Sequence, residues 1–267
     1  MIREMTLGQY YKADSVIHRL DPRVKLMGTL IFIISLFMGM NIWIYAVVTV
    51  ALAVVIKMSR IPLKFMVRGL KSIVILIIIS AVFNLFLTPG DVLIQIWKLT
   101  ITYQGLKMAI FMVVRLIYLI VGTSLMTLTT TPNNLTDGLE KGLGFLKVIK
   151  VPVHEIAMMM SIALRFIPIL IEETDKIMKA QMARGADFEN GSLIKRAKAM
   201  VPILVPLFVS AFRRANELAM AMEARCYHGS EGRTKMKPLK YEKRDRIAYI
   251  SMVLYLGVII IVKIIVA

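Results

Sequence analysis

The sequence predicts an all-α, polytopic membrane protein, and three observations support that fold class. Of the 267 residues, 58% are hydrophobic, and the mean hydropathy is +0.71. No charged residue occurs between Lys25 and Lys57, or from Ser72 to Gly90. Uncharged apolar tracts of roughly 18 residues or more are typical of helices that cross a bilayer, because hydrocarbon cannot hydrogen-bond to an open backbone. We expect about five transmembrane helices and a cytoplasmic module of long helices.

The charge balance is strongly basic, with a net charge of +17 and a pI of about 10.1. On a soluble protein this balance would favour nucleic acid as the partner. In a membrane protein, Lys and Arg collect in cytoplasmic loops and fix the orientation, so we expect membrane lipids and no nucleic acid. The single cysteine, Cys226, excludes an intramolecular disulfide and a cysteine-based metal site. The first apolar run begins only at Leu26, so we expect no cleavable signal peptide.

Residues 1–25 are polar and are expected to form a cytoplasmic N-terminal segment. Asp21 followed by Pro22 predicts a helix start, with Asp at the cap and Pro at the first helical position. The tract Leu26–Ile56 allows either one long tilted helix or a hairpin of two short helices that turns near Gly39-Met40-Asn41. Basic clusters flank both ends of the tract, so the positive-inside bias favours the hairpin.

Two further spans complete a region of four transmembrane helices over residues 26–130. Ser72–Leu87 is the third, and Thr88-Pro89-Gly90 ends it on the outside. The nearly neutral segment Asp91–Lys107 is expected to be an external loop. Met108–Thr130 is the fourth span, and its one charge, Arg115, is expected to pack inside the helix bundle or to reach toward the interface.

Residues 131–246 differ in kind, because their apolar runs alternate with dense mixed charge. Ile156–Ile171 and Met200–Phe212 are short for spans and contain prolines, so we expect amphipathic or partly buried helices at the membrane surface. This region is predicted to be a cytoplasmic module. Residues 247–267 then form a C-terminal transmembrane helix. The protein is therefore expected in the cytoplasmic membrane, with its N-terminus inside and its C-terminus outside.

Motifs for catalysis or cofactor binding are absent from the sequence. There is no P-loop, and His154-Glu155 begins like a zinc protease motif but has Met158 where the second histidine belongs. We therefore expect no catalytic, cofactor-binding or metal-binding residues. The alternative function is a membrane-embedded lipid-modifying enzyme with a basic cytoplasmic face. Its candidate residues are Asp137, Glu140, His154, Glu155, Glu172 and Glu173. A stand-alone channel or carrier is disfavoured, because the spans carry almost no charge to mark a path.

One positive signal is a repeated Ala-x-x-Ala-Arg sequence that ends on a small residue. The candidate site consists of Ala183, Arg184 and Gly185, and of Ala224, Arg225 and Cys226. One interpretation is helix capping. An arginine near a helix C-terminus interacts favourably with the macrodipole, by about 0.3–1 kcal/mol, and Gly185 and Gly229 would close the two helices. The other interpretation is docking into another protein. It also explains the small residues beside each arginine, because another protein can then close around the guanidinium. The residues alone leave both interpretations open.

The paired triplets resemble the two Ala-Arg-Gly motifs of the transmembrane T-component of energy-coupling factor transporters. The N-terminal sequence is similar to that family's opening segment at Gly8-Gln9-Tyr10, Asp14-Ser15 and His18-Arg19-Leu20-Asp21-Pro22-Arg23-Val24-Lys25-Leu26. The resemblance covers essentially the whole chain, and Cys226 departs from the motif's Gly. The full opening segment looks more like the shared, many-substrate version of the family than versions dedicated to cobalt, nickel or biotin.

The resemblance implies a non-catalytic scaffold of an ATP-driven importer of vitamins or other micronutrients. Its partners would be two ABC-type ATPase subunits and a small membrane-embedded substrate-binding S-component. Arg184 would insert into one ATPase and Arg225 into the other, and ATP hydrolysis would move the S-component.

Helix length agrees with such a role. Pro152–Arg184 and Leu193–Arg225 would each span about 45 Å, with prolines that kink them. Several methionines accompany these helices, and a Met-rich surface can repack against different partners. They are Met158, Met159, Met160, Met200, Met220 and Met222.

Overall fold

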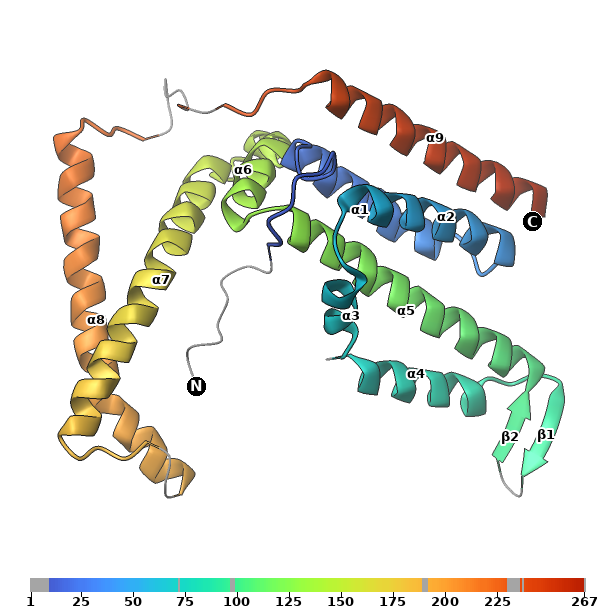
Figure 1. The fold of residues 1–267 in the computed structure, drawn as a ribbon, viewed down its shortest axis with the longest axis horizontal. Coiled ribbons are helices and arrows are strands. Elements are labelled where there is room, and N and C mark those ends of the chain that lie inside the picture. The colour runs from blue at the N-terminus through green and yellow to red at the C-terminus, as the bar shows by residue number, and fades with distance from the viewer. Residues whose placement is uncertain are drawn as a thin grey trace. The chain divides into compact units, whose positions relative to one another are not determined.

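The computed structural model describes residues 10–71, 73–96, 99–188, 192–229, 236 and 238–266. These residues form nine α-helices, one 3-10 helix and two strands (Figure 1). They divide into two compact units. The first, the spanning unit, comprises Gly8–Gly138 and Leu239–Ala267, and the second, the long-helix unit, comprises Leu139–Pro238. The elements are α1 (Pro22–Phe37), α2 (Ile42–Ser59), α3 (Leu63–Lys71), α4 (Val74–Leu87), β1 (Val92–Ile96), β2 (Leu99–Thr102), α5 (Tyr103–Thr129), α6 (Pro132–Gly142), η2 (Gly144–Ile149), α7 (Val153–Ala183), α8 (Leu193–Ala224) and α9 (Lys243–Val266).

Helices α1 and α2 confirm the predicted break in the first apolar tract. Helix α1 starts as predicted, because the Asp21 side chain accepts a hydrogen bond from the Arg23 N–H and Pro22 is the first helical residue. The helix ends at Phe37, and Asn41 caps α2 by accepting from the Trp43 N–H at 3.2 Å. Local capping chemistry therefore interrupts a tract that hydropathy alone cannot divide.

The segment between α2 and α5 is more structured than the sequence predicted. Helix α3 lies in the basic stretch after α2 and was not predicted. The third span begins at Val74, and the expected start at Ser72 lies outside the described residues. The segment expected to be an external loop contains an antiparallel hairpin, in which β1 pairs with β2. The fourth span is longer than predicted, because α5 begins at Tyr103 rather than at Met108.

Within the described residues, four helices are long and apolar enough to cross a membrane: α2, α5, α7 and α9. The bent pair α3 and α4 raises the number to five if it forms one span. Helix α1, with 16 residues, falls below the length of that test. Helix α7 passes because it continues on both sides of the apolar tract Ile156–Ile171. Its place in a cytoplasmic module remains a prediction.

In the spanning unit, α5 packs against α1, α2, α3 and α4, and α1 also packs against α2 and α9. One core cluster joins Leu36 of α1, Tyr45 and Val48 of α2 and Ile259 of α9. Arg115 of α5 is buried, and its Nε donates to the Tyr45 hydroxyl at 3.0 Å. This position confirms that the intramembrane arginine packs inside the bundle, as one of the two predicted alternatives requires.

The long-helix unit is built on α7 and α8, with 31 and 32 residues. The two helices contact each other and run in opposite directions (Figure 1). Pro168 lies inside α7, and Pro202 and Pro206 lie inside α8, where each proline removes an intrahelical hydrogen bond. Both helices have the length that the sequence predicted.

Candidate functional site

The C-terminal end of α7 closes in a Schellman motif around Arg184. The Gly185 N–H donates to the Met182 carbonyl at 3.0 Å, and the Ala186 N–H donates to the Gln181 carbonyl at 3.0 Å. Gly185 has a φ of 87°, the left-handed conformation that this motif places directly after the helix. The small residue after Arg184 therefore ends the helix, and the capping interpretation of Gly185 is confirmed.

The end of α8 repeats this geometry around Arg225. The Cys226 N–H donates to the Glu223 carbonyl at 2.8 Å, and the Tyr227 N–H donates to the Met222 carbonyl at 3.1 Å. Cys226 has a φ of 55°, so a cysteine occupies the left-handed position that Gly185 fills in α7. The prediction that Gly229 closes this helix is wrong, because the chain has already left the helix at Cys226.

Both arginine side chains are exposed, and so are the small residues beside them. The exposed set is Ala183, Arg184, Gly185, Ala224, Arg225 and Cys226. Among the described residues, no hydrogen bond or ion pair joins either guanidinium to the rest of the chain. The macrodipole acts on each arginine, but neither side chain hydrogen-bonds to the end of its own helix. Each guanidinium therefore presents a planar fork of donors at a helix end that lacks bulky neighbours. We call residues 183–185 and 224–226 the docking tips.

The two docking tips lie at opposite ends of the α7–α8 pair (Figure 1). Glu173 of α7 fixes the crossing, because its carboxylate accepts from the Ser210 hydroxyl at 2.5 Å and from an Arg214 Nη at 3.1 Å. Gln181 of α7 contacts the Pro202 carbonyl at 3.5 Å, which confirms the antiparallel register. A partner would therefore meet the two tips at two separate places.

The residues proposed for a lipid-modifying enzyme are largely engaged in structural contacts. His154 Nδ1 lies 2.8 Å from Glu140 Oε1, which joins α6 to the start of α7. The Glu173 carboxylate accepts hydrogen bonds from Ser210 and Arg214. No group of three or more His, Cys, Asp or Glu residues that could hold a metal ion occurs in the described part of the chain.

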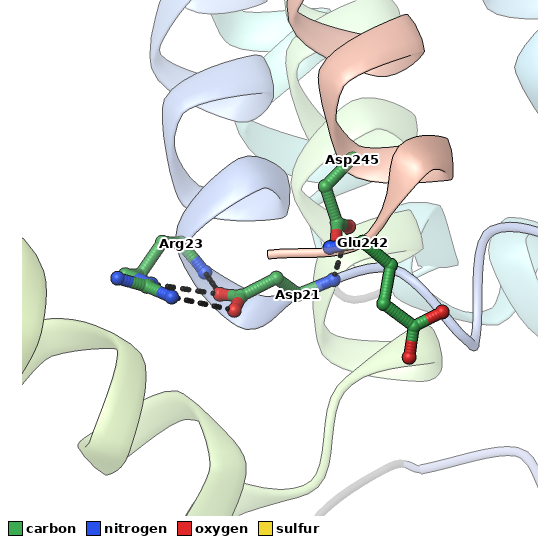
Figure 2. A network of polar contacts seen from close by, with 4 residues as sticks. All are labelled: Asp21, Arg23, Glu242 and Asp245. Atoms are coloured by element: carbon green, nitrogen blue, oxygen red, sulfur yellow. Dashed lines mark hydrogen bonds and ion pairs between the residues drawn. The ribbon is translucent and has the colours of Figure 1, made fainter. Parts of the chain in front are cut away.

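Figure 2 shows a polar network that sequence reasoning missed, in which the opening segment meets the start of α9. Asp245 is 2% exposed, and its carboxylate accepts from the Asp21 N–H at 2.9 Å and from the Glu242 N–H at 2.8 Å. The Asp21 carboxylate accepts in turn from the Arg23 guanidinium at 2.9 Å. The sequence indicated the cap at Asp21, but nothing in it linked that cap to Asp245.

Two neighbouring contacts anchor the same opening segment. Lys25 Nζ donates to the His18 carbonyl at 3.1 Å and to the Thr129 carbonyl at the end of α5 at 2.9 Å. The Arg23 guanidinium lies over the Tyr241 ring, 3.8 Å from its centroid. The opening segment thus ties α1, α5 and α9 together, and its characteristic residues have a structural role within the spanning unit.

Burial and hydrogen bonding act in opposite directions on Asp21. Burial raises the pKa of its carboxyl group, but side-chain and backbone hydrogen bonds from Arg23 outweigh burial, so the pKa lies below its usual value. The carboxylate form is therefore favoured inside the network.

Comparison with known proteins shows the family to which the chain belongs. A family model described as cobalt transport protein, CbiQ, matches residues 13–236. The energy-coupling factor transporter transmembrane protein EcfT of Thermosediminibacter oceani is 56% identical over 250 residues, which cover 94% of each chain. The EcfT proteins of Clostridium kluyveri and Bacillus subtilis are 56% and 47% identical, over 93% and 95% of this chain. The chain therefore belongs to the EcfT group of the CbiQ family, the transmembrane components of energy-coupling factor transporters.

Proposed function

We propose that this transporter subunit, which is not itself an enzyme, couples two ABC-type ATPase subunits to a membrane-embedded S-component that binds a vitamin or another micronutrient. The observation that carries the proposal is the pair of docking tips, which share one backbone geometry and present an exposed arginine each. Arg184 docks into one ATPase and Arg225 into the other. We call the cavity on an ATPase that receives a tip its socket.

The internal symmetry of the long helices supports a pair of similar partners. Glu173 and Arg214 each lie eleven positions before the arginine of their own helix, and they contact each other. Two antiparallel helices that touch at equivalent positions are related by an approximate two-fold axis through the contact. Two similar ATPases arranged about a two-fold axis would present two sockets in the matching arrangement.

Stiff elements are needed to carry a movement from the ATPases to the bilayer. Helices α7 and α8, at 1.5 Å per residue, are each roughly 46–48 Å long. A displacement applied at either tip is therefore transmitted along a continuous helix.

An exposed apolar face on α8 supports a second, membrane-embedded partner. Its residues recur every three or four positions, so they lie on one side of the helix, and each is at least 48% exposed. They are Val201, Leu204, Val205, Phe208, Val209 and Phe212. Contiguous exposed apolar surface of this kind is typical of an interaction site. Four of the six methionines that the sequence singled out are also exposed, namely Met159, Met160, Met200 and Met220. This surface fits an S-component and would adapt to more than one.

The experiment is co-purification after reversal of both tip charges. The double variant Arg184→Glu/Arg225→Glu should lose both ATPases while remaining in the membrane, because removing one partner of a buried charge pair costs about 2–5 kcal/mol. The matched control is Arg165→Glu/Arg213→Glu, which makes the same charge change at two exposed arginines on the same helices. Retention of both ATPases by the tip variant, or equal loss by the control, would refute docking through the tips.

Cys226 allows the proposed orientation to be tested directly. The proposal places the N-terminus and both docking tips in the cytoplasm and the C-terminus outside. Cys226 is the single cysteine of the sequence and is exposed. A membrane-impermeant maleimide should label it in inside-out vesicles and leave it unlabelled in right-side-out vesicles of the subunit expressed without ATPases. The reverse pattern would contradict this orientation.

A further inference from the structure

The shared geometry of the docking tips allows their surroundings to be compared position by position. Arg184 and Arg225 differ by 41 in residue number, and the hydrogen bonds that close the two helices follow the same shift: Met182 corresponds to Glu223, Gly185 to Cys226 and Ala186 to Tyr227. The same shift relates residues 176–188 to residues 217–229, which are the last turns of each helix and the first residues beyond it. As far as Ala186 and Tyr227, where the matching hydrogen bonds end, differences between these segments are therefore differences in side chain on a common backbone.

Charge is the main difference between the two segments. Around the α7 tip, Lys176, Lys179 and Arg184 are opposed by Asp187, which leaves a net charge of +2. Around the α8 tip, Glu217 and Glu223 oppose Arg225, which leaves a net charge of −1 with His228 neutral. All of these side chains are exposed. The shared arginine is thus surrounded by opposite net charge in the two segments.

The reversal is specific to individual positions. Lys176 on α7 corresponds to Glu217 on α8, and the neutral Met182 corresponds to Glu223. At 1.5 Å per residue, these charges lie within about 12 Å of the arginine along the helix. Glu223 and Lys179 lie within the Debye length of roughly 8 Å at physiological salt, and Lys176 and Glu217 lie beyond it. These side chains are exposed, so a socket that received the helix end would meet them at its rim.

We propose that the two docking tips are not interchangeable, and that the charges around each arginine decide which ATPase it receives. The α7 tip fits a socket with a net acidic rim, and the α8 tip fits a socket with a less acidic or basic rim. The arginine supplies the contact common to both sockets, and the surrounding charges reject the wrong one. This inference rests on the proposed docking of two ATPases, and it adds a rule for which ATPase binds which tip.

The test uses full-length chains that keep one working tip. Arg225→Glu leaves the α7 tip, and Arg184→Glu leaves the α8 tip. Each chain is purified in mild detergent, and its binding to each purified ATPase is measured separately. We expect the two chains to prefer different ATPases. The charge-exchange variant Lys176→Glu/Lys179→Met/Met182→Glu, made in the Arg225→Glu chain, gives the last turns of α7 the charges of the corresponding turns of α8. It should shift the ratio of the two affinities by about tenfold toward the ATPase of the α8 tip.

The reciprocal exchange is a control for a folding defect in the first exchange variant. Glu217→Lys/Met220→Lys/Glu223→Met, made in the Arg184→Glu chain, should shift the ratio in the opposite direction. Both preferences should weaken as salt rises from 0.05 to 1 M, since the discriminating charges are exposed. If the ratio of the two affinities changed by less than about twofold in both exchange variants, the charge rule would be overturned and the docking proposal would stand. If the Arg184→Glu/Arg225→Glu chain bound both ATPases as tightly as the wild type does, the docking itself would be refuted.

Discussion

Glu173 and Arg214 form an ion pair of 3.1 Å between α7 and α8, and each lies eleven positions before the arginine at the end of its own helix. At 1.5 Å per residue, the contact lies about 17 Å from each tip. Because the helices run in opposite directions, the tips extend to opposite sides of this contact. The pair therefore helps to set the angle at which α7 crosses α8, and with it the distance between Arg184 and Arg225.

Exchanging the two charges tests this role. Glu173→Arg should lower the thermal midpoint, because it places two cations together and removes the acceptor of Ser210. The double variant Glu173→Arg/Arg214→Glu should recover most of the loss. The side chains are 22% and 35% exposed, so we expect a coupling free energy of about 1 kcal/mol or less. A double-mutant cycle of unfolding midpoints in detergent measures it. If the two single changes simply add, the ion pair has no part in holding the crossing.

Substituting Cys226 by Gly should make the end of α8 more stable. The left-handed conformation at this position costs a residue with a Cβ atom roughly 1–2 kcal/mol, and glycine avoids this strain at a smaller cost in chain entropy. Gly185→Ala places the same strain at the end of α7. Hydrogen exchange at the amides of residues 226–227 and 185–186 should slow in the first variant and accelerate in the second. Faster exchange at residues 226–227 in Cys226→Gly would contradict this account of the helix end.

Local signals in the sequence predicted the first two helices and the presence of two similar helix ends. The two basic clusters predicted the break between α1 and α2, and Asp21-Pro22 predicted the start of α1, because charge bias and capping depend on neighbouring residues. The repeated Ala-x-x-Ala-Arg predicted two equivalent helix ends. The end of α8 was misplaced at Gly229 because cysteine has no preference for the left-handed conformation that Cys226 adopts.

Contacts distant in sequence were beyond such reasoning. Asp21 and Asp245 are 224 positions apart, and nothing near either residue indicates the other. The β1–β2 hairpin was also missed, because its strands lie in a nearly neutral segment that indicated only an external loop. The pairing of Glu173 with Arg214 depends on the register of two antiparallel helices, which their separate sequences do not define.

Removing the Asp245 carboxylate should destabilise the spanning unit. Asp245→Ala leaves the N–H groups of Asp21 and Glu242 without their acceptor at a buried site, and each such loss costs about 1–3 kcal/mol. Asp245→Asn keeps one oxygen acceptor and should cost less. Glu242→Gln is the matched control, because that side chain is 60% exposed. The thermal midpoints in detergent should rank control, Asn and Ala from highest to lowest. Equal midpoints for Asp245→Ala and the control would exclude a structural role for the carboxylate.

The opening segment should loosen at mildly acidic pH through His18. Burial lowers the pKa of His18, and hydrogen bonding to the Tyr11 carbonyl at 3.0 Å only partly opposes this effect. The nearby Lys25 lowers the pKa further, and Asp14 raises it. Because the folded pKa is depressed, the unfolded chain binds the proton more readily. Stability is therefore complete above the unfolded pKa of about 6.5 and falls as pH drops below it.

A His18→Gln variant isolates that contribution. The difference in thermal midpoint between the wild type and this variant should be constant from pH 8 to 7 and should shrink as pH falls from 6.5 toward 5. Both proteins carry the same remaining titratable groups, so their shared pH dependence cancels in the difference. A difference that grows at low pH would mean that the protonated imidazole is favoured in the folded chain.

Gly105 should be among the positions of the spanning unit least tolerant of a side chain. A Cβ atom there would lie 2.9 Å from the Leu85 carbonyl oxygen and 3.1 Å from that of Asn84, so the backbones of α4 and α5 would have to separate. Gly105→Ala should therefore cost about 1–3 kcal/mol, although alanine is the better helix former. Gly257→Ala in α9 meets no atom within 4 Å and should be neutral or stabilising. Unfolding midpoints of the two variants compare the same chemical change at a crowded and an open position. If Gly105→Ala proved as stable as Gly257→Ala, close approach of the α4 backbone to Gly105 would not be what holds α4 against α5.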